Sequence, residues 1–178
     1  MLHIRQMGPQ IGVEVTGIDV KTMGGATWNR IYQAWLDHNV MVVRDQELTI
    51  PDFIAYSGRR GRAKLLNVED QDWKPVFHPI IRTHPETGRR SLYFDPGKIC
   101  YLVGIADAES DALIAELKER MVVPDAEYHH VWRKGDIVIW DNRCSYHRAA
   151  GDYPPEEDRI HWRVSINDYG VEALEAAE

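Results

Sequence analysis

Two runs near the end of the sequence hold the residue types that could do chemistry. The first, 140–148, contains a tryptophan, charged residues and a histidine, and the second, 158–166, alternates polar and apolar side chains. Its β-branched and aromatic residues, without Gly or Pro, predict a strand from Arg159 to Ile166. Side chains alternate across a strand, so one face is polar and the other apolar. The polar face holds Arg159, His161, Arg163 and Ser165.

Two arginines on one strand face need anions if that face is buried. A buried charge without a partner is costly, and a guanidinium presents paired donors that match a carboxylate. His147 lies twelve residues before Arg159 and could place a metal ligand near such an anion. The spacing alone leaves open a second interpretation, a solvated strand face with two unrelated arginines.

The same residues resemble a known family. Trp140-Asp141-Asn142-Arg143 with His147, closed by Arg159-Ile-His-Trp-Arg163, is similar to the C-terminal signature of the taurine/2,4-D dioxygenase (TauD/TfdA) family. Its members are Fe(II)- and 2-oxoglutarate-dependent oxygenases. The resemblance implies a mostly β fold with flanking helices, a double-stranded β-helix that is also called a jelly roll and is cupin-like.

The resemblance also implies a role for each residue of the motif. His147 would be the distal iron-binding histidine, and Arg159 would pair with the far carboxylate of 2-oxoglutarate. Arg163 would line the site and help hold an anionic substrate, with Trp140 packed near the iron. The implied cofactor is Fe(II), with 2-oxoglutarate and O2 as cosubstrates. The implied enzyme hydroxylates a small sulfonate or carboxylate and releases succinate and CO2.

One part of the family pattern is missing. Family members carry His-x-Asp upstream of the distal histidine, which completes the set of three protein ligands to iron. The sequence contains no His-x-Asp, and its one His-x-Glu is His84-Pro85-Glu86. That segment resembles a part of the family that binds no metal. A turn over residues 85–88 would aim Glu86 at solvent, so we reject this pair as iron ligands.

The missing motif bears on the domain organisation. In the family, a long central section with several strands and His-x-Asp separates segments similar to 52–57 and 58–77. Here the two segments are joined directly. We therefore expect a single dioxygenase-like domain over residues 1–178 with its central section missing near 57–64, and hence an incomplete jelly roll. The sequence leaves open whether this section is deleted or belongs to a longer parent chain.

Composition narrows the class of protein. The chain is 44% hydrophobic, which suits a domain with a real core, and its net charge of −7 argues against binding nucleic acid through bulk positive charge. No apolar run approaches the length of a membrane span, and the N-terminus lacks a signal-peptide core. The two cysteines, Cys100 and Cys144, predict reduced thiols in the cytoplasm. We expect a small-molecule substrate, no nucleic-acid or membrane partner, and leave a homo-oligomer open.

Two other functions remain open at this point. The absent His-x-Asp allows a truncated non-catalytic jelly-roll relative that acts as a binding or assembly protein. A cupin-like metal protein would instead draw its ligands from His129, His130, His147 and His161. The adjacent pair His129-His130 would point to opposite strand faces, and a structural role is the favoured interpretation of the inward one.

Periodicity predicts the remaining elements. Helices are expected at 27–39, from Thr49 as N-cap onward, and at 108–121 with Asp107 as its cap. The last of these would present an apolar face of Leu113, Ile114, Leu117 and Met121. Strands are expected at 11–20 with a bend, and at 40–44, 76–83, 91–95, 127–133 and 136–141.

Overall fold

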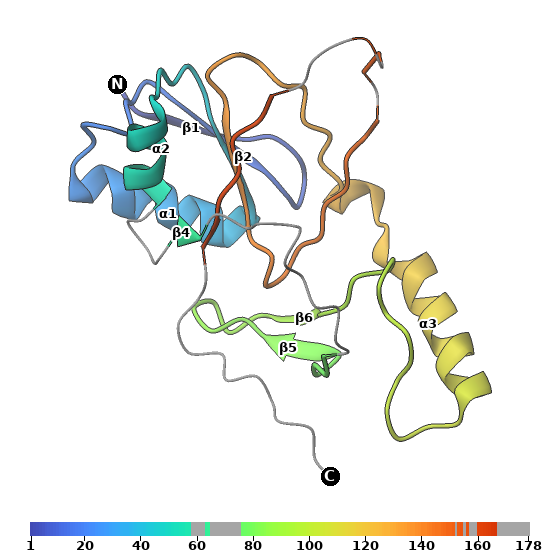
Figure 1. Ribbon diagram of the computed structural model, residues 1–178. Coiled ribbons are helices and arrows are strands. Elements are labelled where there is room, and N and C mark those ends of the chain that lie inside the picture. The colour runs from blue at the N-terminus through green and yellow to red at the C-terminus, as the bar shows by residue number, and fades with distance from the viewer. Residues whose placement is uncertain (58–62, 65–75, 152, 155, 157–159, 167–178) are drawn as a thin grey trace. The chain divides into compact units, whose positions relative to one another are not determined.

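A computed structural model describes residues 1–57, 63–64, 76–151, 153–154, 156 and 160–166 (Figure 1). The chain divides into two compact units, one made of residues 1–46 and 79–146 and the other of 47–78 and 147–178. No helix among the described residues is long and apolar enough to span a bilayer.

The first unit is built on a four-stranded mixed sheet in the order β1-β2-β3-β7. The strands are β1 (His3–Gln6), β2 (Val13–Thr16), β3 (Val40–Val43) and β7 (Ile137–Trp140). β2 and β3 are parallel, and the other two pairs are antiparallel. Val40 lies opposite Trp140 and Val43 opposite Ile137, so the register fixes where β7 ends. A parallel pair needs a crossover, and helix α1 (Gly25–His38) provides it (Figure 1).

The core lies along β3. All four of its residues are buried, which explains an uninterrupted apolar run where an exposed strand would alternate. Val13 and Val15 of β2 are buried beside it, and Ile31 and Leu36 are the buried residues of α1. The predictions of a helix at 27–39 and a strand at 40–44 are confirmed.

Helix α1 ends at a residue in the left-handed conformation. Asn39 has φ of 63°, and its N–H donates to the carbonyl of Trp35 at 2.7 Å. Asn tolerates this conformation better than most residues and closes helices in this way. The cap turns the chain directly into β3, so the end of α1 and the start of the central strand are fixed together.

The other elements are short. In the first unit β5 (Ile81–Thr83) and β6 (Arg90–Leu92) form a hairpin, followed by α3 (Asp107–Met121) and the 3-10 turn η2 (Pro124–Ala126). In the second unit α2 (Ile50–Ser57) begins after Thr49, whose hydroxyl accepts the N–H of Asp52 and donates to its carboxylate. This confirms Thr49 as a capping residue. Strand β4 (Ala63–Lys64) pairs with β8 (Ser165–Ile166).

Several sequence expectations are corrected. Residues 127–133 form no strand, and the strand expected at 76–83 is confined to Ile81–Thr83. Helix α3 begins after Ala106 without a side-chain cap, so Asp107 is its first residue and not its cap. The closing strand is confined to Ser165–Ile166 among the described residues, and Arg159 lies outside them. Residues 58–62, within the expected join near 57–64, also lie outside the described residues, so the missing central section stays a prediction.

The turn before β7 yields a test of packing. Gly135 has φ of +86°, and a Cβ there would lie 2.8 Å from the carbonyl oxygen of Gln46. Gly104 has φ of +91° and open space around it. Gly104→Ala should therefore cost only the left-handed strain, about 1–2 kcal/mol. Gly135→Ala should lower the free energy of unfolding by about 1–3 kcal/mol more, because backbone must move. Urea denaturation of both variants checks this, and equal losses would contradict it.

Candidate functional site

The predicted site residues fall in both units. His147 and Arg163 belong to the second unit, where both are exposed. Trp140 ends β7 in the first unit, is half-buried, and donates its indole N–H to Asn142 Oδ1 at 2.9 Å. Arg159, the predicted carboxylate partner, lies outside the described residues. That these four side chains share one cavity stays a prediction.

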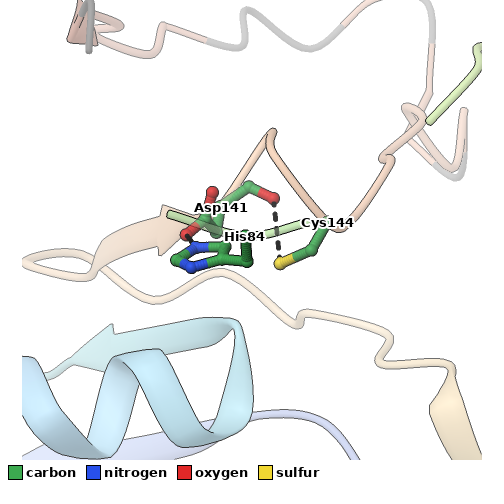
Figure 2. Close-up of side chains that lie close together, drawn as sticks. All are labelled: His84, Asp141 and Cys144. Atoms are coloured by element: carbon green, nitrogen blue, oxygen red, sulfur yellow. Dashed lines mark hydrogen bonds and ion pairs between the residues drawn. The ribbon is translucent and has the colours of Figure 1, made fainter. Parts of the chain in front are cut away.

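A different cluster is fully formed in the first unit. Among the described residues, one group of three metal-type side chains comes together, with ligand atoms all within 4.8 Å of one another. It consists of His84, Asp141 and Cys144 (Figure 2). His84 follows β5, and the other two stand on the turn directly after β7. Sequence reasoning did not find this group, because His84 and Asp141 are 57 residues apart and share no local pattern.

The hydrogen bonds of His84 fix its tautomer. Its Nδ1 faces two backbone donors, the N–H groups of Glu86 at 3.2 Å and Thr87 at 3.1 Å. Nδ1 is therefore an acceptor, and the proton sits on Nε2, which donates to Asp141 Oδ2 at 3.0 Å. Both side chains are only 4% exposed. Both ring nitrogens are thus occupied within the protein.

The carboxylate of Asp141 is likewise fully engaged in hydrogen bonds within the protein. Besides His84, its carboxylate accepts the backbone N–H of Arg143 at 2.9 Å and the guanidinium Nε and Nη2 at 2.8 and 2.7 Å. Burial acts to raise the pKa of Asp141, but the hydrogen bonds from Arg143 and His84 outweigh it and hold the pKa below its ordinary value. The charged carboxylate therefore stabilises the fold above its unfolded-state pKa, and this contribution is lost as the pH falls through the folded-state pKa.

The backbone of Asp141 organises the turn that precedes His147. Its N–H donates to the carbonyl of Asn39, the cap of α1, at 3.0 Å. Its carbonyl accepts the N–H of Cys144 and both the N–H and the hydroxyl of Ser145. Asp and Ser commonly stabilise turns through such local bonds. The turn is thus anchored to α1 at one end, and it ends two residues before His147.

Arg143 extends the network to the surface. Its Nη1 donates to Glu86 at 2.9 Å, and Glu86 also accepts the hydroxyl of Tyr32 at 2.8 Å. The guanidinium lies 5.8 Å from the centre of the Trp35 ring, within cation–π range. Glu86 is exposed, as expected for this turn, but its carboxylate is also held by the Tyr32 hydroxyl and the Arg143 guanidinium. The turn itself, 85–88, is confirmed.

Cys144 is held as a thiol. Its Sγ lies 3.3 Å from Asn39 Oδ1, to which it donates. Burial, together with the nearby charge of Asp141, raises the pKa of Cys144 to about 11. A metal ligand must be a thiolate, so this environment opposes coordination. With His84 and Asp141 already occupied, the cluster is a structural clamp and does not fit a metal ion.

Of the remaining candidate histidines, His161 is exposed in the second unit, and His129 and His130 lie in the first. His130 Nε2 donates to Asp136 Oδ2 at 3.1 Å, and its Nδ1 accepts the Tyr128 hydroxyl at 2.9 Å. Burial lowers the pKa of His130, which keeps it neutral in this arrangement. His129 is exposed beside Glu127. A structural role for the inward histidine is confirmed, and the cupin-like ligand set does not appear among the groups that the described residues bring together.

Replacement of the Asp141 carboxylate should disrupt the clamp and destabilise the protein. Asp141→Asn leaves Arg143 and the His84 Nε2–H without their buried anion, which should lower the free energy of unfolding by about 3 kcal/mol or more at pH 7. The exposed Asp37→Asn is the control, with a change within about 0.5 kcal/mol. Urea denaturation measures both. The gap between wild type and Asp141→Asn should narrow below about pH 4, where the carboxylate takes up a proton. A gap independent of pH would contradict the role of its charge.

The raised pKa of Cys144 makes a chemical prediction. At pH 8 its thiolate fraction is about a hundredfold below that of an ordinary thiol, so iodoacetamide should alkylate it about a hundredfold more slowly in the folded protein. In denaturant the rate should return to normal. Mass mapping of the peptide that contains residue 144 follows the reaction, with the exposed Cys100 as an internal reference. Equal folded and unfolded rates at Cys144 would refute the burial of this thiol.

Comparison of the sequence with known proteins identifies relatives. A segment of 91 residues is 39% identical to the (S)-phenoxypropionate/alpha-ketoglutarate-dioxygenase of Sphingobium herbicidovorans, and covers 51% of this chain and 31% of that protein. A segment of 75 residues is 43% identical to the alpha-ketoglutarate-dependent 2,4-dichlorophenoxyacetate dioxygenase of Burkholderia sp. (strain RASC), and covers 42% and 25%. The matched part thus spans about a third or less of these relatives.

The fold has solved counterparts. The crystal structure of a taurine dioxygenase from Burkholderia xenovorans matches with a TM-score of 0.70 at 21% identity, over 80% of each chain. This shows a common fold. The sequence model of the taurine catabolism dioxygenase TauD, TfdA family matches residues 55–165, more than half of the chain. The resemblance predicted from the C-terminal motif is confirmed, and the chain belongs to the TauD/TfdA family.

Proposed function

We propose that this chain carries part of the active site of an Fe(II)- and 2-oxoglutarate-dependent dioxygenase that hydroxylates a small anionic sulfonate or carboxylate. The supporting observation is that the family match over 55–165 includes every residue of the predicted site. Two relatives of this chain are named as alpha-ketoglutarate-dependent enzymes of phenoxy acids. The site residues are His147, Arg159, Arg163 and Trp140.

The proposed roles follow from side-chain chemistry. Arg159 would hold the far carboxylate of 2-oxoglutarate through two parallel, charge-assisted hydrogen bonds. Arg163 would attract the anionic group of the substrate, and Trp140 would shape the apolar wall of the cavity. His147 follows the turn anchored by Asp141, so the clamp fixes the backbone that leads into it. These residues bind and orient, while the oxidative chemistry belongs to the cofactor.

The residues of this chain do not fit Fe(II) without help. The facial site of such enzymes takes two histidines and a carboxylate. His147 supplies one ligand, and the sequence contains no His-x-Asp to supply the others. His84 and Glu86 do not offer themselves as replacements, because both ring nitrogens of His84 are hydrogen-bonded within the protein, and the Glu86 carboxylate accepts from Tyr32 at both oxygens and from Arg143 at Oε1. The two ligands that the family takes from His-x-Asp are therefore missing from the printed sequence, no group among the described residues replaces them, and we derive no reaction step through the metal.

The same reasoning supports an incomplete jelly roll. We propose that residues 1–178 form one dioxygenase-like domain whose central section is missing near 57–64. The direct join of two segments that the family separates supports this. Both cysteines are free thiols, which fits the proposed cytoplasmic location.

The intact mass of the purified protein tests the join, since 20.5 kDa is the mass of the printed sequence and a clearly larger mass means that a section is missing from it.

The absent His-x-Asp favours one alternative. A shortened, non-catalytic jelly-roll relative that acts as a binding or assembly protein would need no iron. Metal content separates the two, because one histidine holds Fe(II) poorly and a full triad holds it well. Anaerobic titration of the full-length protein, with its central section present, with Fe(II) and then 2-oxoglutarate gives a metal-to-ligand charge-transfer band only in a dioxygenase. The absence of this band and of O2-dependent succinate would reject the dioxygenase and leave the alternative.

Arg159→Lys tests the proposed cosubstrate site. Loss of the bidentate contact should cost about 1.5–3 kcal/mol, which raises the Kd for 2-oxoglutarate about ten- to hundredfold. Thermal stability should fall only slightly, because the aliphatic stem survives. The same anaerobic titration measures the Kd, with Arg90→Lys, on strand β6, as a matched control. An unchanged Kd would move the carboxylate partner to another residue, with Arg163 the first to test.

A further inference from the structure

Three side chains that the proposed function does not use form a hydrogen-bonded chain in the first unit. The hydroxyl of Tyr128 lies 2.9 Å from Nδ1 of His130, and Nε2 of the same ring lies 3.1 Å from Oδ2 of Asp136. Tyr128 is half-buried, whereas the side chains of His130 and Asp136 are 10% and 1% exposed. The chain therefore runs from a buried carboxylate through an imidazole to a phenol nearer the surface.

The direction of each bond follows from the carboxylate. Asp136 Oδ2 also accepts the guanidinium Nη1 of Arg44 at 2.6 Å and the backbone N–H of Arg133 at 2.8 Å. A carboxylate that pairs with a guanidinium is an acceptor, so His130 Nε2 donates to it. Burial lowers the pKa of His130, so the ring is neutral and its Nδ1 carries a lone pair. Tyr128 donates its proton to that lone pair.

Packing holds the phenol and the imidazole in place. Trp132 meets the ring of His130 edge-on, with ring centres 4.6 Å apart and planes at 89°. The ring of Tyr128 lies against the start of β2, since a Cβ at Gly12 would be 3.7 Å from its Cγ. The hydroxyl and the base are thus paired before any substrate arrives, which lowers the entropic cost of a reaction at the hydroxyl.

This arrangement is the one that activates a weak nucleophile. A base stands within hydrogen-bond reach of the hydroxyl, and a third group behind the base orients it. Burial raises the pKa of Tyr128, and the carboxylates of Glu14 and Asp136 add to this. The guanidiniums of Arg44 and Arg133 act in the opposite direction, and the net pKa lies above its ordinary value. The phenol is therefore protonated near neutral pH and reacts only as the base takes its proton.

We propose that Tyr128 is a nucleophile that accepts the acyl group of an activated ester or thioester, with His130 as its general base and Asp136 as the positioning residue of that base. Acyl transfer suits the site because one imidazole serves first as base and then as acid. The proposal is independent of the dioxygenase function, since none of its residues belongs to the predicted active site.

The step balances within the three side chains and the acyl donor. The phenol oxygen of Tyr128 bonds to the carbonyl carbon while its proton passes to Nδ1 of His130. The bond from that carbon to the leaving group then breaks, and the imidazolium returns the proton to the departing alcohol or thiol. An aryl ester remains on Tyr128, and His130 is neutral again.

Acetylation of the full chain by p-nitrophenyl acetate tests the proposal. Peptide mass mapping gives the rate at each tyrosine, with the 53% exposed Tyr101 as internal reference. At about pH 7 Tyr128 should react about a hundredfold faster than Tyr101, the usual contribution of a positioned base. Its rate should stay level from about pH 7 to about pH 9, whereas an ordinary phenol gains about tenfold per pH unit as its phenolate forms. Reaction at Tyr128 no faster than at Tyr101, or with the pH dependence of an ordinary phenol, overturns the proposal.

A variant without the base separates the chemistry from the fold. His130→Gln keeps a side-chain N–H for Asp136 but has no basic nitrogen, so Tyr128 should react about a hundredfold more slowly and follow the pH dependence of an ordinary phenol. His129→Gln, at an adjacent side chain that is 73% exposed, is the matched control and should leave the rate unchanged. Circular dichroism shows whether each variant is folded. A folded His130→Gln that reacts like wild type overturns the proposal, and if this variant does not fold, the pH profile of the wild type decides.

Discussion

The hydrogen bond between His84 Nε2 and Asp141 Oδ2 is the contact on which the order of the first unit depends. It joins a hairpin loop to the end of a core strand across 57 residues of sequence, with both side chains almost fully buried. A buried carboxylate is tolerated only when its charge is compensated, and Arg143 supplies the compensation from two residues away. Three side chains are therefore interdependent, because the loss of any one leaves a buried polar group unpaired.

This interdependence reaches helix α1 through Asn39. Asn39 ends the helix in the left-handed conformation, its carbonyl accepts the N–H of Asp141, and its side chain accepts from Cys144 and from Arg89. One residue thus couples the helix end, the start of the central strand and the turn after β7. The chain that leaves this turn leads into His147, so the backbone before the predicted metal ligand is set by contacts far from it in sequence.

The sequence predicted the elements that local rules control. The helix at 27–39 and the strand at 40–44 have strong periodicity or an uninterrupted apolar run, and both are present. The strand expected at 127–133 failed because alternation does not guarantee a neighbouring strand, and its inward histidine bonds instead to Tyr128 and Asp136. The clamp could not be predicted, because no local sequence pattern around His84 or Asp141 indicates that the two side chains are in contact. Asp141 was recognised only as part of a family motif, without its partner.

The clamp also explains why the missing ligands cannot be replaced from within the first unit. A site that could bind a metal needs donors with free lone pairs, whereas His84 spends both nitrogens on the protein and Cys144 keeps its proton. Freeing His84 for a metal would break its bonds to the turn at 86–87 and strip Asp141 of a donor. A metal at His84 would therefore disorder the turn that precedes His147. His84 therefore cannot both hold the turn and ligate a metal, and in this structure it holds the turn.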